Sequence, residues 1–182
     1  MSAAPAAPTG YNVLSKADLT SALLGIEDMP TGYSQDPPSE SDGNKTFCDY
    51  EPPFHEKIRV RRDLTKGGGL SAQLLSVTLR QYANAREAKA SFAVLTKTIS
   101  TCRSETYEGS KLEYAPLSAP KVGEASVGVR ITSDGTTLVQ NFALVGPTVL
   151  SAGGGGLTNT NADEAADLLG DQVDAYHTAA KS

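Results

Sequence analysis

Three stretches of the chain carry hydrophobic residues at helical spacing. The first begins after Ser15, a candidate N-cap, and ends at Gly25. The second and third begin after Asn84 and Asn161, each followed three residues later by a glutamate. We therefore expect three amphipathic helices. The buried stripe of the second helix consists of Ala88, Phe92, Leu95, Ile99 and Cys102.

Between these stretches the pattern changes to alternation. Residues 56–64 and 71–82 predict two strands before the second helix, with a bulge near Leu74 to correct a change of phase. Residues 107–114 indicate two short strands after it. Residues 148–152 predict a further strand.

The clearest turn signal is Asp134-Gly135, which favours a two-residue hairpin. Counting outward from this turn predicts the cross-strand pairs Ile131–Leu138, Val129–Gln140 and Val127–Phe142. We interpret Gly153 to Gly156, a run of four glycines, as a flexible loop before the last helix.

The element order predicts an α+β fold, in which an antiparallel sheet is flanked by three helices in a single domain. This domain is expected to span residues 14–182. Residues 1–13, rich in alanine and proline, are expected to form a flexible tether. Glu27 to Asp49 is rich in Pro, Ser, Asp and Gly and predicts a long irregular crossing.

Cys48 and Cys102 are the only cysteines, and they lie 54 positions apart. A zinc site usually needs four N or S ligands, and a redox couple usually needs Cys-x-x-Cys. We expect one structural disulfide, which would tie the irregular crossing to the second helix. Two reduced, buried thiols are the alternative interpretation.

Composition limits the partners. The net charge of −5 argues against nucleic-acid binding, and no apolar run reaches the length of a membrane helix. With a disulfide, we expect an extracytoplasmic protein that meets a membrane only through a signal or lipid-anchored cysteine upstream of Met1. A cytosolic protein is the alternative.

No residue set specifies a reaction. Ser118 and Lys121 have the spacing of a Ser-x-x-Lys motif, but two prolines oppose the helix that the motif requires. Nothing in the spacing of His55 and His177 links either histidine to a nucleophile or an acid. We therefore expect no catalytic residue, metal or cofactor.

Basic side chains gather on one predicted strand. Arg59 and Arg61 alternate with apolar residues and so share the polar face, where we expect Arg80 and Tyr82 of the next strand to join them. Arg130 of the hairpin is a further candidate. One interpretation is a solvated face with salt bridges to Glu56, Asp63 and Glu113. The other is a groove that offers guanidinium groups to an anionic ligand.

Four segments resemble a known family. Asp28-Met29-Pro30-Thr31-Gly32-Tyr33 follows the first helix, and the second helix ends at Cys102. Val122-Gly123-Glu124-Ala125-Ser126 precedes the hairpin, and Val145-Gly146 closes it. Together these resemble the extracellular sensor domain of PknH-type mycobacterial serine/threonine kinases, which also occurs in actinobacterial lipoproteins.

The resemblance implies a non-catalytic, exported α+β domain with a cleft, a disulfide and an unidentified envelope ligand. The chain departs from the family in two respects. Two cysteines cannot supply the second disulfide of the kinase domain, and Ile99-Ser100-Thr101 stands where a tryptophan often occurs. We carry over no ligand residues beyond the disulfide pair.

Three hypotheses follow. The first is an exported binding or sensor domain that holds an anionic or lipid-like ligand near Arg59, Arg61, Arg80 and Tyr82, with the 27–49 crossing as a rim. The second is a carrier of lipids or glycolipids, which requires an apolar cavity of several hundred Å³. The third, a hydrolase, has no motif in its favour.

Overall fold

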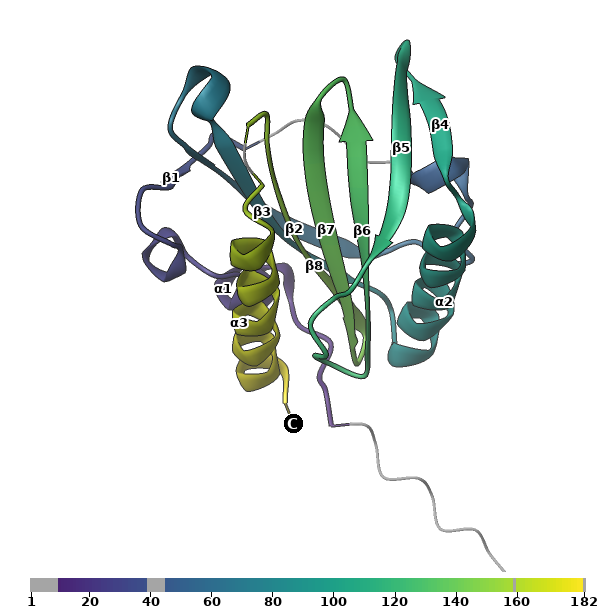
Figure 1. Ribbon diagram of the computed structural model, residues 1–182. Coiled ribbons are helices and arrows are strands. Elements are labelled where there is room, and N and C mark those ends of the chain that lie inside the picture. Colours follow the sequence, from purple (N-terminus) through teal and green to yellow (C-terminus); the bar gives the residue numbers. More distant parts are fainter. Residues whose placement is uncertain (1–9, 39–44, 159, 182) are drawn as a thin grey trace, which may run out of the picture.

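The computed structural model describes residues 10–38, 45–158 and 160–181. Its elements follow the expected order, with a short additional strand early in the chain (Figure 1). In sequence they are α1 (Lys16–Ala22), η1 (Ile26–Asp28), β1 (Ser34–Gln35), η2 (Phe47–Asp49), β2 (Ile58–Lys66), η3 (Gly69–Ser71), β3 (Gln73–Gln81), α2 (Ala85–Thr101), β4 (Ser104–Tyr107), β5 (Ser110–Leu117), β6 (Ala125–Ser133), β7 (Thr136–Val145), β8 (Thr148–Gly156) and α3 (Ala162–Ala180).

Within the described residues, the strands form one sheet of eight, in the order β1-β2-β3-β8-β7-β6-β5-β4. All the pairs are antiparallel. The last strand, β8, therefore lies in the middle, between β3 and β7. The predicted α+β fold, with three helices around an antiparallel sheet, is confirmed.

The two faces of the sheet carry separate hydrophobic cores. Side chains alternate along β7 and β8, so Ala143 and Leu150 face α1 and α3, whereas Leu144 and Val149 face α2. In Figure 1, α1 and α3 lie together near β2 and β3, and α2 lies toward the β5 end. Each face is thus covered at a different end.

The helix starts show which capping predictions hold. The Ser15 hydroxyl accepts a hydrogen bond from the Asp18 N–H, and the Asn84 side chain accepts one from the Glu87 N–H, so both predicted caps are confirmed. Asn161 precedes α3 as predicted, but its side chain does not cap the helix. Instead its Nδ2 donates to the Tyr33 hydroxyl at 2.7 Å and to the Leu74 carbonyl at 2.9 Å.

The hairpin prediction is confirmed residue by residue. Asp134 and Gly135 form the turn between β6 and β7, both with positive φ. The three predicted cross-strand pairs, Ile131–Leu138, Val129–Gln140 and Val127–Phe142, are all present.

The run of four glycines is not a loop. Gly153 to Gly156 continue β8, are buried, and pair with β3 on one side and β7 on the other. Neighbouring side chains occupy the space where β-carbons would stand: Leu138 lies over Gly155 and Asn161 lies against Gly154. A central strand without side chains is possible here because its neighbours fill the space above it.

The predicted bulge near Leu74 is also wrong. Strands β2 and β3 pair without interruption from Ile58–Gln81 to Lys66–Gln73. Leu74 keeps its regular position and remains 47% exposed, on the face that carries α2. That part of the face lies away from α2, so an apolar side chain out of phase needs no correction.

The two ends of the described chain meet. Tyr11 pairs with Lys181 in an isolated bridge, and the Asn12 N–H donates to the Ala180 carbonyl at 2.7 Å. Most of the predicted tether, residues 1–9, lies outside the described residues. No helix in the described ranges is long and apolar enough to cross a membrane.

We predict opposite effects from alanine at two glycines. A β-carbon at Gly154 would stand 2.3 Å from the buried Asn161 Oδ1, so Gly154→Ala should lower the free energy of unfolding by about 1–3 kcal/mol. Gly170, inside α3, has no atom within 4 Å of that position, and Gly170→Ala should raise it by about 0.5–1 kcal/mol. Urea denaturation measures both, and equal effects would contradict this account of β8.

Candidate functional site

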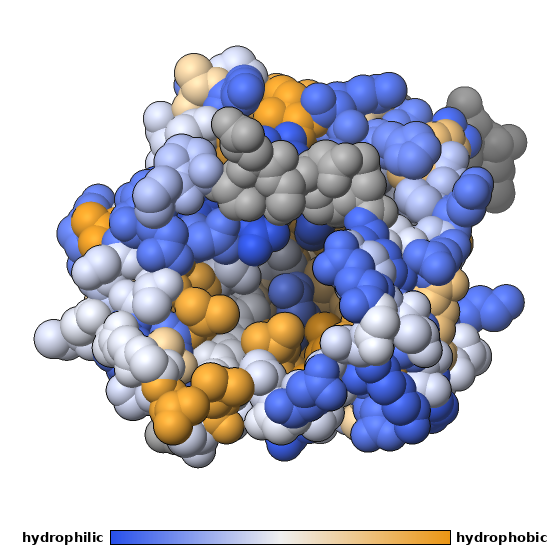
Figure 2. All heavy atoms as spheres, turned by 90° about the horizontal axis from the view of Figure 1, so that it is seen from above, coloured by the Kyte–Doolittle hydropathy of each residue, from blue (hydrophilic) through white to orange (hydrophobic). Residues whose placement is uncertain are grey.

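A cleft of about 930 Å³ opens on the face of the sheet that carries α2. It lies between the strands on one side and α2 with residues 45–56 on the other. Figure 2, viewed along the sheet, shows a hollow with hydrophobic surfaces inside it and hydrophilic surfaces around it. The volume is within the usual range for small-molecule sites.

One part of the cleft is apolar and rich in aromatic side chains. Phe47 contacts the rings of Tyr114 and Phe142 edge-on, with centroid distances of 5.3 and 6.2 Å. Burial raises the pKa of the Tyr114 hydroxyl to about 12, so this ring is neutral at physiological pH. Further apolar side chains that line the cleft are Phe92, Leu95, Leu112, Ile131, Leu138 and Val149.

The other part of the cleft carries the residues singled out from the sequence. Arg61, Arg80 and Tyr82 line it, and Arg59 lies directly opposite Arg80 across the β2–β3 pair. These side chains share one face because the alternation continues across the two strands. The structure thus brings the four predicted residues together, and their role in ligand binding stays a prediction.

Each arginine of this group has a carboxylate nearby. Arg61 binds Asp63 closely, with Nε 2.9 Å from both carboxylate oxygens. Glu56 is shared: its Oε1 lies 3.4 Å from Nε of Arg59 and 3.9 Å from Nε of Arg80. The predicted salt bridges to Glu56 and Asp63 are therefore present, whereas Glu113 pairs with Lys111.

Arg80 is the least compensated of these charges. Its side chain is 26% exposed, and loss of hydration lowers the pKa of the guanidinium. Glu56 raises that pKa and Arg59 lowers it. Within the described residues, no group accepts a hydrogen bond from this side chain, and its ion-pair distance is at the limit of contact. A guanidinium has five N–H donors, so Arg80 can bind an incoming anion.

Two tyrosines stand beside Arg80. Tyr82 is 6% exposed, and burial followed by the charge of Glu56 raises the pKa of its hydroxyl. Burial also raises the pKa of Tyr50 to about 12. Both rings are therefore neutral at pH 7 and offer apolar surface with a hydroxyl at the edge.

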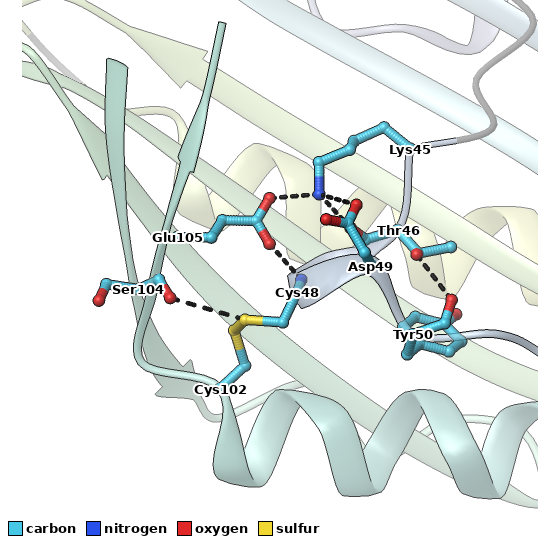
Figure 3. Close-up of polar contacts among 8 residues, drawn as sticks. All are labelled: Lys45, Thr46, Cys48, Asp49, Tyr50, Cys102, Ser104 and Glu105. Atoms are coloured by element: carbon cyan, nitrogen blue, oxygen red, sulfur yellow. Dashed lines mark hydrogen bonds and ion pairs between the residues drawn. A yellow bond between two sulfur atoms is a disulfide. The ribbon is translucent and has the colours of Figure 1, made fainter. Parts of the chain in front are cut away.

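The wall made by residues 45–50 is attached covalently. Cys48 and Cys102 form the expected disulfide, with a Cα–Cα distance of 6.3 Å (Figure 3). Glu105, on β4, accepts a hydrogen bond from the Cys48 N–H and forms an ion pair with Lys45. Lys45 also contacts Asp49 at 2.9 Å, so one lysine joins two carboxylates across the wall.

This attachment holds an unfavourable backbone. Cys48 and Asp49 are consecutive non-glycine residues with φ of 50° and 51°. A left-handed conformation costs an ordinary L-residue roughly 1–2 kcal/mol. The disulfide and the Glu105 contacts offset this cost and fix the bend that turns Phe47 and Tyr50 toward the cleft.

The cysteines and histidines are the remaining candidates for chemistry. Cys48, Cys102 and Glu105 are close enough together to hold a metal, but both sulfurs are consumed by the disulfide. His55 lines the cleft, whereas His177 lies on α3 and hydrogen-bonds through Nδ1 with the Tyr11 hydroxyl at 2.7 Å.

One candidate is excluded by register. Arg130 pairs across the hairpin with Val139, which belongs to the core under α3, so Arg130 faces away from the cleft. The apolar part of the cleft and the contacts of Glu105 were not predicted from the sequence. Alternation indicates that Ile131, Leu138 and Phe142 share a face, but it does not indicate that α2 leaves part of that face open.

Comparisons with known proteins identify the fold. No protein-family model matches the sequence, and no curated protein matches it. Among solved structures, the extracellular domain of PknH from Mycobacterium tuberculosis is similar, with a TM-score of 0.64 at 11% identity. The match covers 93% of this chain and 100% of that one. The chain therefore has the fold of the PknH extracellular domain, as the resemblance predicted, and membership of the family stays a prediction.

We predict that the disulfide stabilises the domain strongly. A closed loop of this length corresponds to about 4 kcal/mol in the chain-entropy model, so the Cys48→Ser/Cys102→Ser variant should lose a comparable free energy of unfolding. Dithiothreitol should destabilise the wild type and leave the double variant unchanged. Two free thiols titrated in the unreduced native protein would contradict the pairing.

Proposed function

We propose that this chain is an extracytoplasmic, non-catalytic binding domain that holds an amphipathic ligand with an anionic group. The disulfide supports the location, because such bonds persist in oxidising compartments. The similarity to the PknH extracellular domain supports the same assignment. Attachment to a membrane by an upstream lipid anchor belongs to this proposal.

The observation that carries the proposal is the setting of Arg80. A dehydrated guanidinium with one distant carboxylate lines the same cleft as a group of aromatic and aliphatic side chains. A phosphate or carboxylate would supply the hydrogen-bond acceptors that this side chain has not found. An alkyl chain would cover Phe92, Leu95 and Phe142.

A second candidate function, carriage of lipids between envelope layers, is favoured by the size of the cleft. A volume of about 930 Å³ exceeds what an anionic group alone would need. Binding and carriage share the same ligand chemistry and differ in whether the protein retains its ligand during purification.

We predict that charge reversal on the cleft face prevents binding of an anionic amphiphile. Arg61→Glu and Arg80→Glu should each weaken binding of dodecyl phosphate, below its micelle concentration, by about ten- to hundredfold, because a charged hydrogen bond contributes about 1.5–3 kcal/mol. Isothermal titration calorimetry measures the affinity, and thermal denaturation should show nearly unchanged stability.

Arg130→Glu is the matched control, since it reverses the same charge on the opposite face of the sheet. It should bind dodecyl phosphate as the wild type does. If all three variants lose affinity equally, only the overall charge matters and the assignment of the cleft is wrong. A parallel loss of melting temperature in the Arg61 and Arg80 variants would make these residues structural.

Extraction of the protein purified from its native host separates the two functions. A carrier should release a lipid or glycolipid close to one mole per mole of protein, identified by mass spectrometry of an organic extract. A sensor with reversible occupancy should release much less, and should then bind added amphiphile in calorimetry.

A further inference from the structure

A second hollow lies beside the cleft, on the same face of the sheet. It has a volume of about 320 Å³ and is lined by residues of β2, β3, β7 and β8 together with Asp36. Arg61, Leu138 and Gln140 line both spaces, so the hollow and the cleft adjoin. The proposed function gives the cleft an anion and an alkyl chain, and the hollow has no role in it.

The floor of the hollow is one row of cross-strand neighbours. Asp63, Ser76, Gly153 and Gln140 lie opposite one another on β2, β3, β8 and β7. Side chains in such a row share a face of the sheet and stand close together. Gly153 contributes no side chain, and the Gln140 amide lies over it, with Nε2 3.0 Å from where a β-carbon would stand.

The polar groups of the hollow include both donors and acceptors. Within the part of the chain that the structure describes, the side chains of Ser76 and Gln140 make no hydrogen bond. The Asp36 carboxylate accepts from the Thr65 hydroxyl at 2.8 Å, and Asp63 binds Arg61. A carboxylate has about four acceptor positions, so both retain capacity for further donors.

The neighbouring row supplies apolar surface. Leu74 and Leu138 flank Gly155 and are 47% and 36% exposed. A ring that carries hydroxyl groups at its edge and C–H groups on its faces fits this combination, since each hydroxyl both donates and accepts. A simple amine would donate to the carboxylates and leave the Gln140 N–H groups and the leucines without a match.

We infer that the hollow is a subsite for a polyhydroxylated ring, a sugar or a cyclitol, that belongs to the ligand of the cleft. The inference rests on the proposed function and names its ligand class: an amphiphile whose alkyl chain lies in the cleft and whose ring lies in the hollow, beside Ser76 and Gln140. Arg61, at the boundary, contacts the group that joins the two parts.

The test compares two amphiphiles with the same chain and the same phosphodiester charge. Lysophosphatidylinositol carries the ring, and lysophosphatidylmethanol does not. The wild type should bind the first at least tenfold more tightly in calorimetry. Ser76→Leu, which fills the hollow, and Asp36→Asn, which removes acceptor strength from its edge, should each reduce this preference to less than threefold while affinity for lysophosphatidylmethanol stays within threefold of the wild type.

Glu113→Gln is the control for the loss of a carboxylate, because Glu113 is exposed on β5 and pairs with Lys111. It should retain the full preference. Dodecyl maltoside distinguishes the source of the ring: binding that Ser76→Leu abolishes indicates a glycolipid, and a preference confined to lysophosphatidylinositol indicates an inositol phospholipid.

Equal affinity for the two lysophospholipids, or a preference that survives in both variants, would overturn the subsite and leave the proposed function standing. Failure of the wild type to bind either lysophospholipid, with dodecyl phosphate also inactive, would instead contradict the proposed function and the subsite with it.

Discussion

Helices cover only part of the sheet face that carries the cleft. Eight strands at about 4.8 Å spacing extend over roughly 34 Å, whereas a helix is about 10 Å across. In the described ranges, α2 is the one helix packed on this face, and it lies over β5 to β8. The strands beyond it must therefore carry side chains that tolerate water. Arg59, Arg61 and Asp63 satisfy this requirement on β2.

The disulfide supplies the cover that α2 does not. It brings an irregular segment over the end of the sheet, where Phe47 packs on Tyr114 and Phe142. The space that remains between this segment, α2 and the exposed strands is the cleft. Its mixed character follows directly: aromatic side chains come from the covered part of the face, and arginines come from the uncovered part.

Local patterns were sufficient for much of this architecture. The hairpin register follows from Asp134-Gly135, and the N-caps at Ser15 and Asn84 follow from short-range preference. Alternation on β2 and β3 placed Arg61, Arg80 and Tyr82 on one face. The prediction that Arg130 joins this group was wrong. Alternation shows which residues of one strand share a face, but which face of the sheet they occupy depends on the pairing of that strand with β7. The prediction of a loop at Gly153 to Gly156 was wrong for a related reason. Glycines show no hydrophobic pattern, and a strand is possible there because the side chains of Leu138, Gln140 and Asn161 cover it. The Glu105 contacts, formed across 57 residues, have no local signal.

The bridge between Tyr11 and Lys181 determines how the cleft is oriented relative to the two ends of the described chain. Tyr11 packs against Gly146, in the β7–β8 turn, while the cleft approaches the opposite end of the sheet, near Tyr107 and Leu138. Figure 1 shows the described N-terminal segment and the C-terminus together at the far end from the β6–β7 turn. A linker, anchor or fused module joined at either end would start there, so the entrance would point outward from whatever holds the domain. Ligand would then enter and leave without obstruction by the attachment.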